Sequence, residues 1–313
     1  CGARVLNFPW CDDFSAARNF GLDTATGRWI LVLDADEYLP ESSVDALRDL
    51  IETPADRAFH LINKSSSDGG KTGLSGKIVR LFPNRPEIRF EWPVHEQVVT
   101  SLNRAGIPIL DTSIEIIHTG YSSPEANAAK QERNLRILEK FTAADPEPDP
   151  MALFLQGGAL LDLARENEAL DFYRRCADSS GGSGVLFHGA LVRMCTCLSA
   201  LGRPNEILAL VPPGPPEDWH PEMLLHVGEA LMEAGRIDDG LRFLYLGLAS
   251  ESRPLIPAYD PVRIKARCVM AMSTPLKKTN PNLALSLLKL AATSIQQGRE
   301  ISPSDLESLI GQA

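Results

Sequence analysis

The spacing of hydrophobic and polar residues changes near residue 145, and this change divides the chain into two parts. Before it, short apolar runs of strand length alternate with segments whose apolar residues recur every three or four positions, as on one face of a helix. After it, helical spacing continues almost without strand-like runs. Residues 145–150 carry three prolines in six positions, which no helix can continue through. The pattern therefore predicts two domains, residues 1–145 and residues 146–313.

The first part has the pattern of an α/β domain with a mixed sheet. Helices are expected at 12–27, 40–51 and 123–141, each with a capping residue or a proline at its start. Strands are expected at 29–33, 58–62, 77–82, 89–92, 94–102 and 114–117, and a loop is expected at 65–70. A helix, a strand and then several strands in succession indicate a sheet whose strands run in both directions.

The second part repeats a pair of helices. The turn residues Ala164-Arg165, Gly202-Arg203 and Gly235-Arg236 recur at intervals of roughly 34 residues, the period of tetratricopeptide (TPR) repeats. A fourth, weaker pair is expected at 262–272 and 283–295. A terminal helix that begins at Ser302-Pro303 is expected to close the stack. This part is predicted to be an all-α helical-repeat domain.

An acidic motif follows the first predicted strand. The five apolar residues Trp29–Leu33 have the length of a strand buried on both faces, and Asp34-Ala35-Asp36-Glu37 comes next. Ligands of open α/β sheets bind beyond the carboxyl ends of strands. Carboxylates this close repel one another unless a cation offsets them, and oxygen ligands suit Mg²⁺ or Mn²⁺. Asp34 and Asp36 are therefore predicted to hold such an ion, which would bind phosphate oxygens.

Composition narrows the class of protein. The net charge is −10, and acidic residues outnumber basic ones in both parts, which argues against nucleic acid as a partner. The six cysteines lack zinc-type spacing and are expected to be free thiols in a reducing compartment. No apolar run has the length of a membrane span. A cytoplasmic protein is expected, and the oligomeric state is left open. Because the chain opens on Cys1, we also expect a preceding segment.

Three segments stand in an order that resembles a known family. These are FPWCDDFSAARNFGLDTATGRWILVLDADEYL at 8–39, RLFPNRPEIRFEWPVHEQV at 80–98 and IEIIHTGY at 114–121. They are similar to family 2 glycosyltransferases of the GT-A fold, and with the TPR-like helices they resemble bacterial members that carry a C-terminal repeat domain. The resemblance covers residues 2–145 closely and the repeats loosely. It implies a Rossmann-like nucleotide-sugar domain without its N-terminal strand or strands. Because that part of the donor pocket is expected to be missing, weak or absent turnover by residues 1–313 alone is expected.

The same resemblance implies the metal and the base. Asp34 and Asp36 match the DxD pair, in which the second acid binds Mn²⁺ or Mg²⁺ and the first lies close to the ribose and the metal. His118 matches a histidine that completes the metal shell. Glu96 matches the catalytic base of inverting members, although Gln97 stands where many relatives carry a second acid.

Four basic or polar residues are candidates for holding the nucleotide-diphosphate sugar. Arg18 and Asn19 match the family segment that lines the donor pocket. Lys77 and Arg80 flank a strand beside a glycine-containing segment. For these two, phosphate contact and a purely structural role are both open.

The leading hypothesis is a metal-dependent, hexosyltransferase-type enzyme whose repeat domain docks a peptide, protein or glycan acceptor. A phosphatase-like hydrolase also places DxD after an apolar strand, but Glu37-Tyr38 after the second acid argues against it. A non-enzymatic alternative is a repeat scaffold with a vestigial, inactive transferase domain. The sequence does not identify the sugar, the nucleotide or the acceptor.

Overall fold

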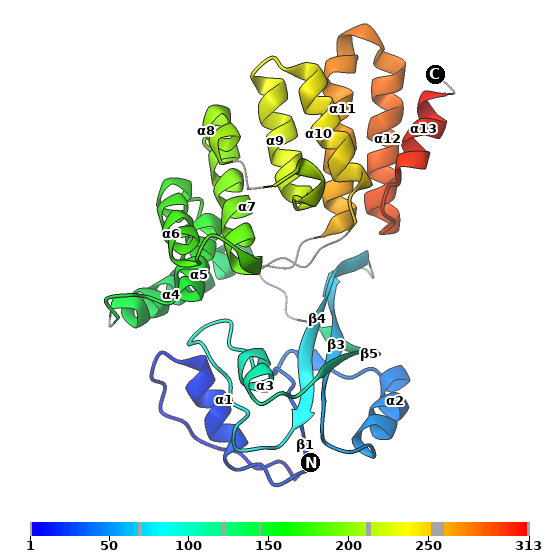
Figure 1. The fold of residues 1–313 in the computed structure, drawn as a ribbon. Coiled ribbons are helices and arrows are strands. Elements are labelled where there is room, and N and C mark those ends of the chain that lie inside the picture. Colours follow the sequence, from blue (N-terminus) through cyan, green and yellow to red (C-terminus); the bar gives the residue numbers. More distant parts are fainter. Residues whose placement is uncertain are drawn as a thin grey trace. The chain divides into compact units, whose positions relative to one another are not determined.

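A computed structural model describes residues 2–67, 71–119, 123–143, 145–210, 214–251 and 260–311 (Figure 1). The chain divides into two compact units, Cys1–Asp145 and Pro146–Ala313. No helix in the described ranges is long and apolar enough to cross a membrane. Each unit is described by itself below.

A five-stranded mixed sheet organises the N-terminal unit. Its strands lie in the order β1-β4-β3-β5-β2, and only β3 and β5 pair in parallel. The bounds are β1 (Trp29–Leu31), β2 (Glu37–Tyr38), β3 (Ala58–Ser67), β4 (Lys71–Pro83) and β5 (Ile109–His118). The predicted α/β domain with a mixed sheet is confirmed.

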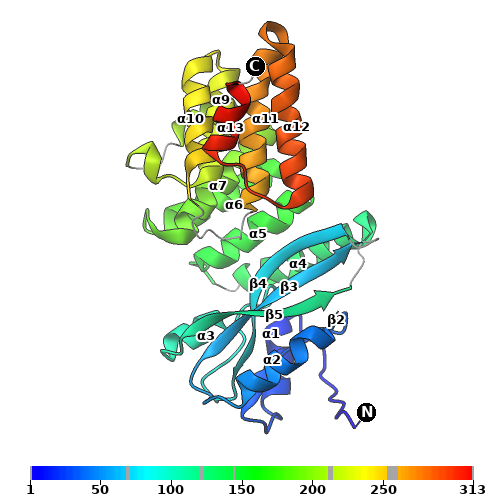
Figure 2. The ribbon, with the colours of Figure 1, turned by 90° about the vertical axis from the view of Figure 1, so that its right-hand side faces the viewer.

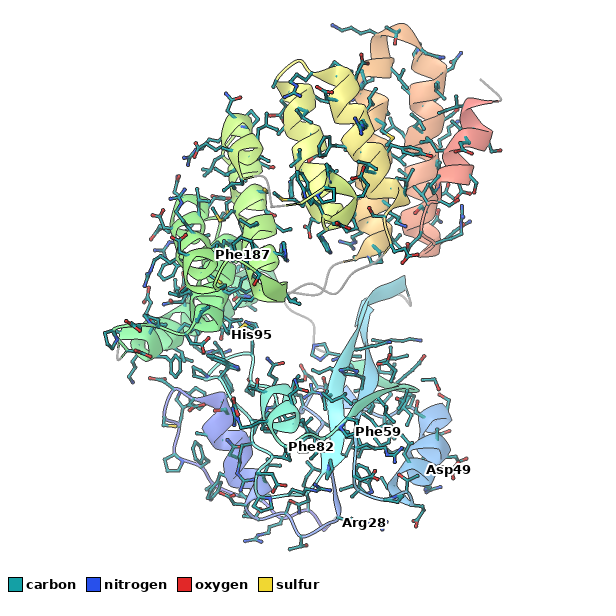
Figure 3. The ribbon with its side chains drawn as sticks, viewed as in Figure 1. Arg28, Asp49, Phe59, Phe82, His95 and Phe187 are labelled. Atoms are coloured by element: carbon teal, nitrogen blue, oxygen red, sulfur yellow. The ribbon has the colours of Figure 1, made fainter. Side chains whose placement is uncertain are left out.

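Helices cover both faces of this sheet. The bounds are α1 (Phe14–Leu22), α2 (Glu41–Ile51), α3 (Val99–Arg104) and α4 (Pro124–Ala143). On one face Phe59 and Leu81 pack with apolar residues of α2, and on the other Phe82 packs with residues of α1 and α3. Figures 1 and 2 show α2 on the side of the sheet opposite α1 and α3, and Figure 3 shows Phe59 and Phe82 between them. Asp13 begins α1 as its N-cap and accepts a hydrogen bond from the Ala16 amide.

A β-bulge interrupts β4 at Arg80. Phe59 pairs with Leu81, but the next residue of β3, His60, pairs with Val79, so Arg80 is the extra residue on its strand. A bulge re-aims the side chain of the residue it inserts. As a result Val79 and Phe82, three positions apart, belong to the same apolar cluster, while Arg80 is directed to a different set of partners.

Several strand predictions were wrong. Residues 94–102 contain no strand and lead into α3, and residues 89–92 make only an isolated bridge between Glu91 and Gln97. Ser65–Ser67 belong to β3 rather than to a loop, and 68–70 lie outside the described residues. The run at 29–33 is not buried on both faces. Because β1 is an edge strand, Leu31 and Leu33 remain 36% and 39% exposed.

The C-terminal unit consists of successive antiparallel helix pairs, as the repeat pattern predicts. The described helices are α5 (Pro150–Asp162), α6 (Glu166–Ser179), α7 (Gly184–Ala200), α8 (Pro204–Ala209), η1 (Pro216–Asp218), α9 (Pro221–Glu233), α10 (Ile237–Ala249), α11 (Pro261–Thr279), α12 (Pro281–Gln297) and α13 (Pro303–Ile310). Ser302 and Asp305 form a capping box at the start of α13.

The recurring turn has a structural cause. Arg165, Arg203 and Arg236 each occupy the N-cap position of the second helix of a pair. Each guanidinium binds the carboxylate three residues further along, at Glu168, Glu206 and Asp239. An acid in the first turn of a helix is also favoured by the helix dipole. The sequence repeat therefore marks a repeated way of starting a helix.

Candidate active site

Asp34 lies at the centre of a chain of ion pairs between β1 and β2. Its Oδ1 accepts a hydrogen bond from Arg18 Nη2 at 2.7 Å, and its Oδ2 accepts one from Arg80 Nη2 at 2.8 Å. Burial alone favours the neutral form of this carboxyl group. The hydrogen bonds and charges of the two arginines outweigh burial, so the pKa of Asp34 is lowered.

Glu37 fixes the turn that carries the two aspartates. Its carboxylate is 2% exposed and accepts hydrogen bonds from the Asp34 amide, from Asn63 Nδ2 and from Arg80 Nη2. Arg80 is nearly as buried, because the bulge in β4 directs its guanidinium inward between the two acids. These contacts hold the Asp34–Glu37 segment in one conformation and leave Asp36 at its exposed corner.

Arg18 connects this network to Glu96. Its Nε donates to Glu96 Oε1 at 2.5 Å, and its guanidinium carbon lies 5.3 Å from the centre of the Phe90 ring. Burial would lower the pKa of Arg18, but the carboxylates of Glu96 and Asp34 outweigh it and raise that pKa. Arg18 thus joins the predicted donor-side acid to the predicted base.

The backbone around Glu96 is strained. Trp92 and His95 have positive φ values of 81° and 55°, a region that bulky side chains rarely adopt. Strain of this kind persists where surrounding contacts over-determine it, and it concentrates at functional sites. The bridge between Glu91 and Gln97 and the ion pair from Glu96 to Arg18 provide such contacts.

Asp36 and His118 meet where β2 pairs with β5. Glu37 and His118 are register partners, and the carbonyl of Asp36 accepts hydrogen bonds from the amide and hydroxyl of Thr119. His118 Nδ1 lies 3.6 Å from Asp36 Oδ1. In contrast to Asp34, the Asp36 side chain is 49% exposed and binds none of the arginines that the structure describes.

These contacts distinguish the predicted metal ligands from one another. Within the described ranges, no three or more His, Cys, Asp or Glu side chains are grouped to hold a metal ion. Asp36 and His118 form a pair of N and O ligands that suits a divalent cation completed by ligand oxygens. Asp34 fits less well, because both of its oxygens already bind guanidinium groups.

Two predicted donor-site residues are engaged elsewhere. The side-chain amide of Asn19 bonds to both backbone groups of Phe90, at 2.9 Å each, and so ties α1 to the segment before Glu96. Lys77 binds Asp111 on β5 in an exposed pair, and within the described residues it makes no hydrogen bond or ion pair with the acidic turn. The structure therefore brings together Arg18, Asp34, Arg80 and Glu96, places Asp36 and His118 side by side next to them, and leaves Lys77 apart.

Sequence reasoning missed Asn63 and Phe90 as supports of the site. Phe90 lies in the predicted strand 89–92 and Asn63 directly follows the predicted strand 58–62, and their contacts join residues far apart in the chain. The bulge that aims Arg80 also has no local sequence signal. Glu37 directly follows the acidic pair, so it is a support of the site that the sequence makes accessible.

Comparison with known proteins shows which proteins the N-terminal unit is similar to. Residues 1–107, which include Asp34, Asp36 and Glu96, match the family model described as glycosyl transferase family 2. The glycosyltransferase SunS of Bacillus phage SPbeta and the SPbeta prophage-derived glycosyltransferase SunS of Bacillus subtilis strain 168 are each 25% identical to this chain over 192 residues. That match covers 60% of this chain and 45% of each relative.

A TPR repeat-containing protein of Synechococcus elongatus is 46% identical over 101 residues, which cover 32% of this chain and 25% of that protein. The matched regions thus span a quarter to somewhat less than half of the relatives' own length. Together with the mixed sheet and the helix pairs, these matches confirm the resemblance to family 2 glycosyltransferases joined to TPR-like repeats.

Proposed function

We propose that this chain carries the active site of a metal-dependent, inverting glycosyltransferase that moves a hexose from a nucleotide-diphosphate donor to an acceptor. The family match and the SunS relatives support glycosyl transfer in general. The observation that carries the residue assignment is the ion-pair chain from Glu96 through Arg18 to Asp34, which connects a candidate base with the acidic turn.

Arg18 and Arg80 are the groups that orient the donor in this proposal. A guanidinium has five N–H donors, and the hydrogen bonds of Arg18 to Glu96 and Asp34 use one at Nε and one at Nη2. The remaining donors are suited to diphosphate oxygens, which guanidinium groups bind well. Arg80 is held by Glu37 and Asp34, so it contributes positive charge from a fixed position.

Asp36 and His118 would hold Mn²⁺ or Mg²⁺, and the ion would offset the negative charge of the departing diphosphate. Direct binding by Asp34 requires one arginine to be exchanged for the cation. We therefore assign Asp34 mainly to anchoring Arg18 beside the metal ligands. Asn19 is proposed to support the donor pocket indirectly, because its side chain binds the backbone of Phe90. Lys77 is the weakest of the proposed phosphate contacts, because Asp111 already binds it.

Glu96 would accept the proton of the acceptor nucleophile. Its carboxylate is largely buried, and Arg18 fixes one of its oxygens, so the other oxygen is available in a defined orientation. Inversion is proposed from the family resemblance, in which the matching carboxylate is the base of inverting members. The strained residues Trp92 and His95 hold the segment that presents it.

The repeat unit would dock the acceptor, for which a peptide or protein fits the extended surfaces of helical repeats. We also propose a cytoplasmic location, since the described cysteines are all free thiols and four of the five are buried. The competing proposal, a repeat scaffold with an inactive transferase domain, is favoured by the arginine contacts that occupy Asp34.

The test is a screen of nucleotide sugars for Mn²⁺-dependent hydrolysis or transfer by the protein encoded by the complete reading frame. Asp36→Ala should lower turnover by about 100-fold or more, because it removes a group that binds the ion at the developing charge. Asp49→Ala, on the exposed face of α2, is the matched control and should retain full activity (Figure 3). Equal turnover by the two variants would contradict the metal assignment, and a folded protein that neither binds nor hydrolyses any donor would favour the scaffold.

A further inference from the structure

The terminal helix α13 packs against α10 and α12, the second helices of two successive pairs in the C-terminal unit (Figure 2). Its residues Leu306 and Ile310 form one side of an apolar pocket of about 480 Å³. The other sides come from α10, α11 and α12, where Leu241, Leu276 and Leu283 are only partly buried. None of the described residues that line the pocket belongs to α5, α7 or α9, so it is separate from the surface that these first helices share.

The lining of the pocket is almost entirely hydrocarbon. Of the described residues that form it, all except Arg242 and Tyr245 are Leu, Ile or Met. The hydroxyl of Tyr245 already donates to Glu307 Oε1 at 3.3 Å. A peptide backbone placed in such a pocket would give up its hydrogen bonds with water and find few in return, which is costly. A hydrocarbon chain has no polar group to lose, so it suits this lining better.

The volume of the pocket suits a chain better than a single side chain. Small-molecule sites in proteins measure about 300–1,000 Å³. An engineered apolar cavity of about 150 Å³ takes one benzene ring, so 480 Å³ has room for a chain on the order of ten carbons. Ile310 is 52% exposed and Tyr245 is 39% exposed. A bound chain would remove this apolar surface from water, which favours binding.

Arg242 is the charged side chain of the pocket, and it is available to a ligand. It is exposed, so it lies at the rim, and its guanidinium makes no hydrogen bond or ion pair with any residue that the structure describes. Asp238 lies one turn earlier on α10, at a spacing that allows pairing, yet the two side chains do not bind each other. Two further cations, Lys277 and Lys278, directly follow the lining residue Leu276 in the last turn of α11. An anion at the rim would therefore meet positive charge.

We propose that this pocket binds a monomeric fatty acid, with its alkyl chain between α10, α12 and α13 and its carboxylate on Arg242. The two ends of such a molecule match the two chemistries of the pocket. The chain buries apolar surface, and the carboxylate accepts charge-assisted hydrogen bonds from the guanidinium. An alcohol of the same length would satisfy only the apolar lining, and an inorganic anion only Arg242. This ligand is additional to a sugar donor, and its binding does not depend on glycosyl transfer.

The first test is calorimetric titration of the full chain with octanoate, decanoate and dodecanoate, each below its micellar concentration. Each buried methylene should tighten binding about fourfold, so each step of two carbons should lower the dissociation constant about fifteenfold until the chain outgrows the pocket. No binding of any of the three, or an affinity that is the same for all of them, would overturn the proposal.

The second test separates the carboxylate from the chain. Arg242→Gln should weaken the binding of decanoate about three- to fivefold, as for an exposed ion pair, and leave the binding of decanol unchanged. Lys289→Gln removes an exposed cation of α12 that does not line the pocket, so this matched control should bind both ligands normally. If Arg242→Gln weakened both ligands equally, or neither, the carboxylate would not lie on Arg242 and the proposal would be wrong.

The third test uses two residues of equal exposure. Ile310 and Leu285 are each 52% exposed, but only Ile310 is among the described residues that line the pocket. Ile310→Asp removes apolar lining and adds a like charge near the carboxylate, so it should weaken decanoate binding about tenfold or more. Leu285→Asp should bind decanoate normally, and circular dichroism checks that both variants are folded. Equal affinities in the two folded variants would place the ligand elsewhere and overturn the site.

A membrane surface is the competing occupant of this apolar rim. Sedimentation with phosphatidylglycerol vesicles should show no binding that Ile310→Asp removes. If the chain binds vesicles through Ile310 but does not bind monomeric decanoate, the pocket contacts a membrane and the fatty-acid site is wrong.

Discussion

Buried charges are paired in the N-terminal unit, whereas in the repeat unit one buried acid and one half-buried arginine make no hydrogen bond or ion pair with a described residue. Asp34, Glu37 and Glu96 each bind Arg18 or Arg80 at 2.5–2.8 Å. Arg193 and Glu222 lie one helical turn before Thr196 and His226, which contact each other, yet neither charged side chain makes a hydrogen bond or ion pair with a described residue. The same residue types therefore serve two different purposes in one chain.

The difference indicates when each region acquires its geometry. A network of paired charges is organised before a ligand arrives, as transition-state stabilisation requires. Unpaired charges keep their hydrogen-bonding capacity for a ligand and reduce the stability of the free protein until it binds. The first arrangement suits chemistry, and the second suits recognition. Each prediction below alters a charge or a helix cap to test this contrast.

The largest effect is expected from Arg80→Leu. Removing one partner of a buried ion pair leaves uncompensated charge at Glu37 and Asp34, so the free energy of unfolding of the N-terminal unit should fall by about 3–5 kcal/mol. Chemical denaturation monitored by tryptophan fluorescence measures this change. Lys77→Leu is the control on the same strand, and because its pair with Asp111 is exposed it should change stability by about 1 kcal/mol or less. Similar losses in both variants would remove the distinction between a buried network and a surface pair.

Opposite pH dependences are expected for a paired and an unpaired acid of the repeat unit. Hydrogen bonds from Arg299 and Ser302 lower the pKa of Asp305 to about 2. Its stabilisation is therefore present above the unfolded value of about 3.9 and is lost as the pH falls towards about 2. The pKa of Glu222 is raised, so the folded state binds the extra proton and stability falls as the pH rises above about 4.3.

These signs can be measured as differences from variants that do not titrate. Asp305→Asn should be less stable than the unaltered chain at pH 7, and the two should converge near pH 2. Glu222→Gln should be more stable at neutral pH, and the difference should disappear below about pH 4. If Asp305→Asn and Glu222→Gln both raised, or both lowered, the stability at pH 7, the contrast between the paired and the unpaired acid would be wrong.

The smallest effects are expected from removing a helix cap, a feature that occurs in both units. Asp13 and Ser302 each accept a hydrogen bond from a backbone amide in the first turn of a helix. Replacing either with Ala should lower the free energy of unfolding by about 1 kcal/mol. Denaturant titration measures the loss of unfolding free energy in Asp13→Ala and in Ser302→Ala. If the two losses differ by more than about 1 kcal/mol, the units differ in more than their buried charges.

Much of the fold could be predicted because the decisive signals are local. Caps and first-turn prolines located the helices, and the repeated turn around Arg165, Arg203 and Arg236 located the helix pairs. The strand predicted at 94–102 was wrong. Its buried residues Val94, Val98 and Leu102 are four positions apart, a spacing that favours a helix over a strand. β-branched residues at two of these positions obscured that period.

The candidate site was only partly accessible to sequence reasoning. Asp34, Arg18 and Glu96 were named one by one, but nothing local indicated that a single guanidinium joins the other two. The burial predicted for β1 also depended on its neighbours in the sheet, which a single run of residues does not reveal. Glu222 and Arg193 passed unnoticed, because a charge on a helix is normally a solvated one.

The bulge in β4 makes the candidate site sensitive to the length of a strand as well as to its residues. Deleting one position beside Arg80 would keep the arginine in the sequence, yet it would restore regular pairing with β3 and reverse the facing of half the strand. Exchanging one side chain for another is expected to be tolerable at exposed positions of β4 such as Lys77. Insertions and deletions beside Arg80 are not, so a constant residue count in this strand is the signature to look for when related chains are aligned.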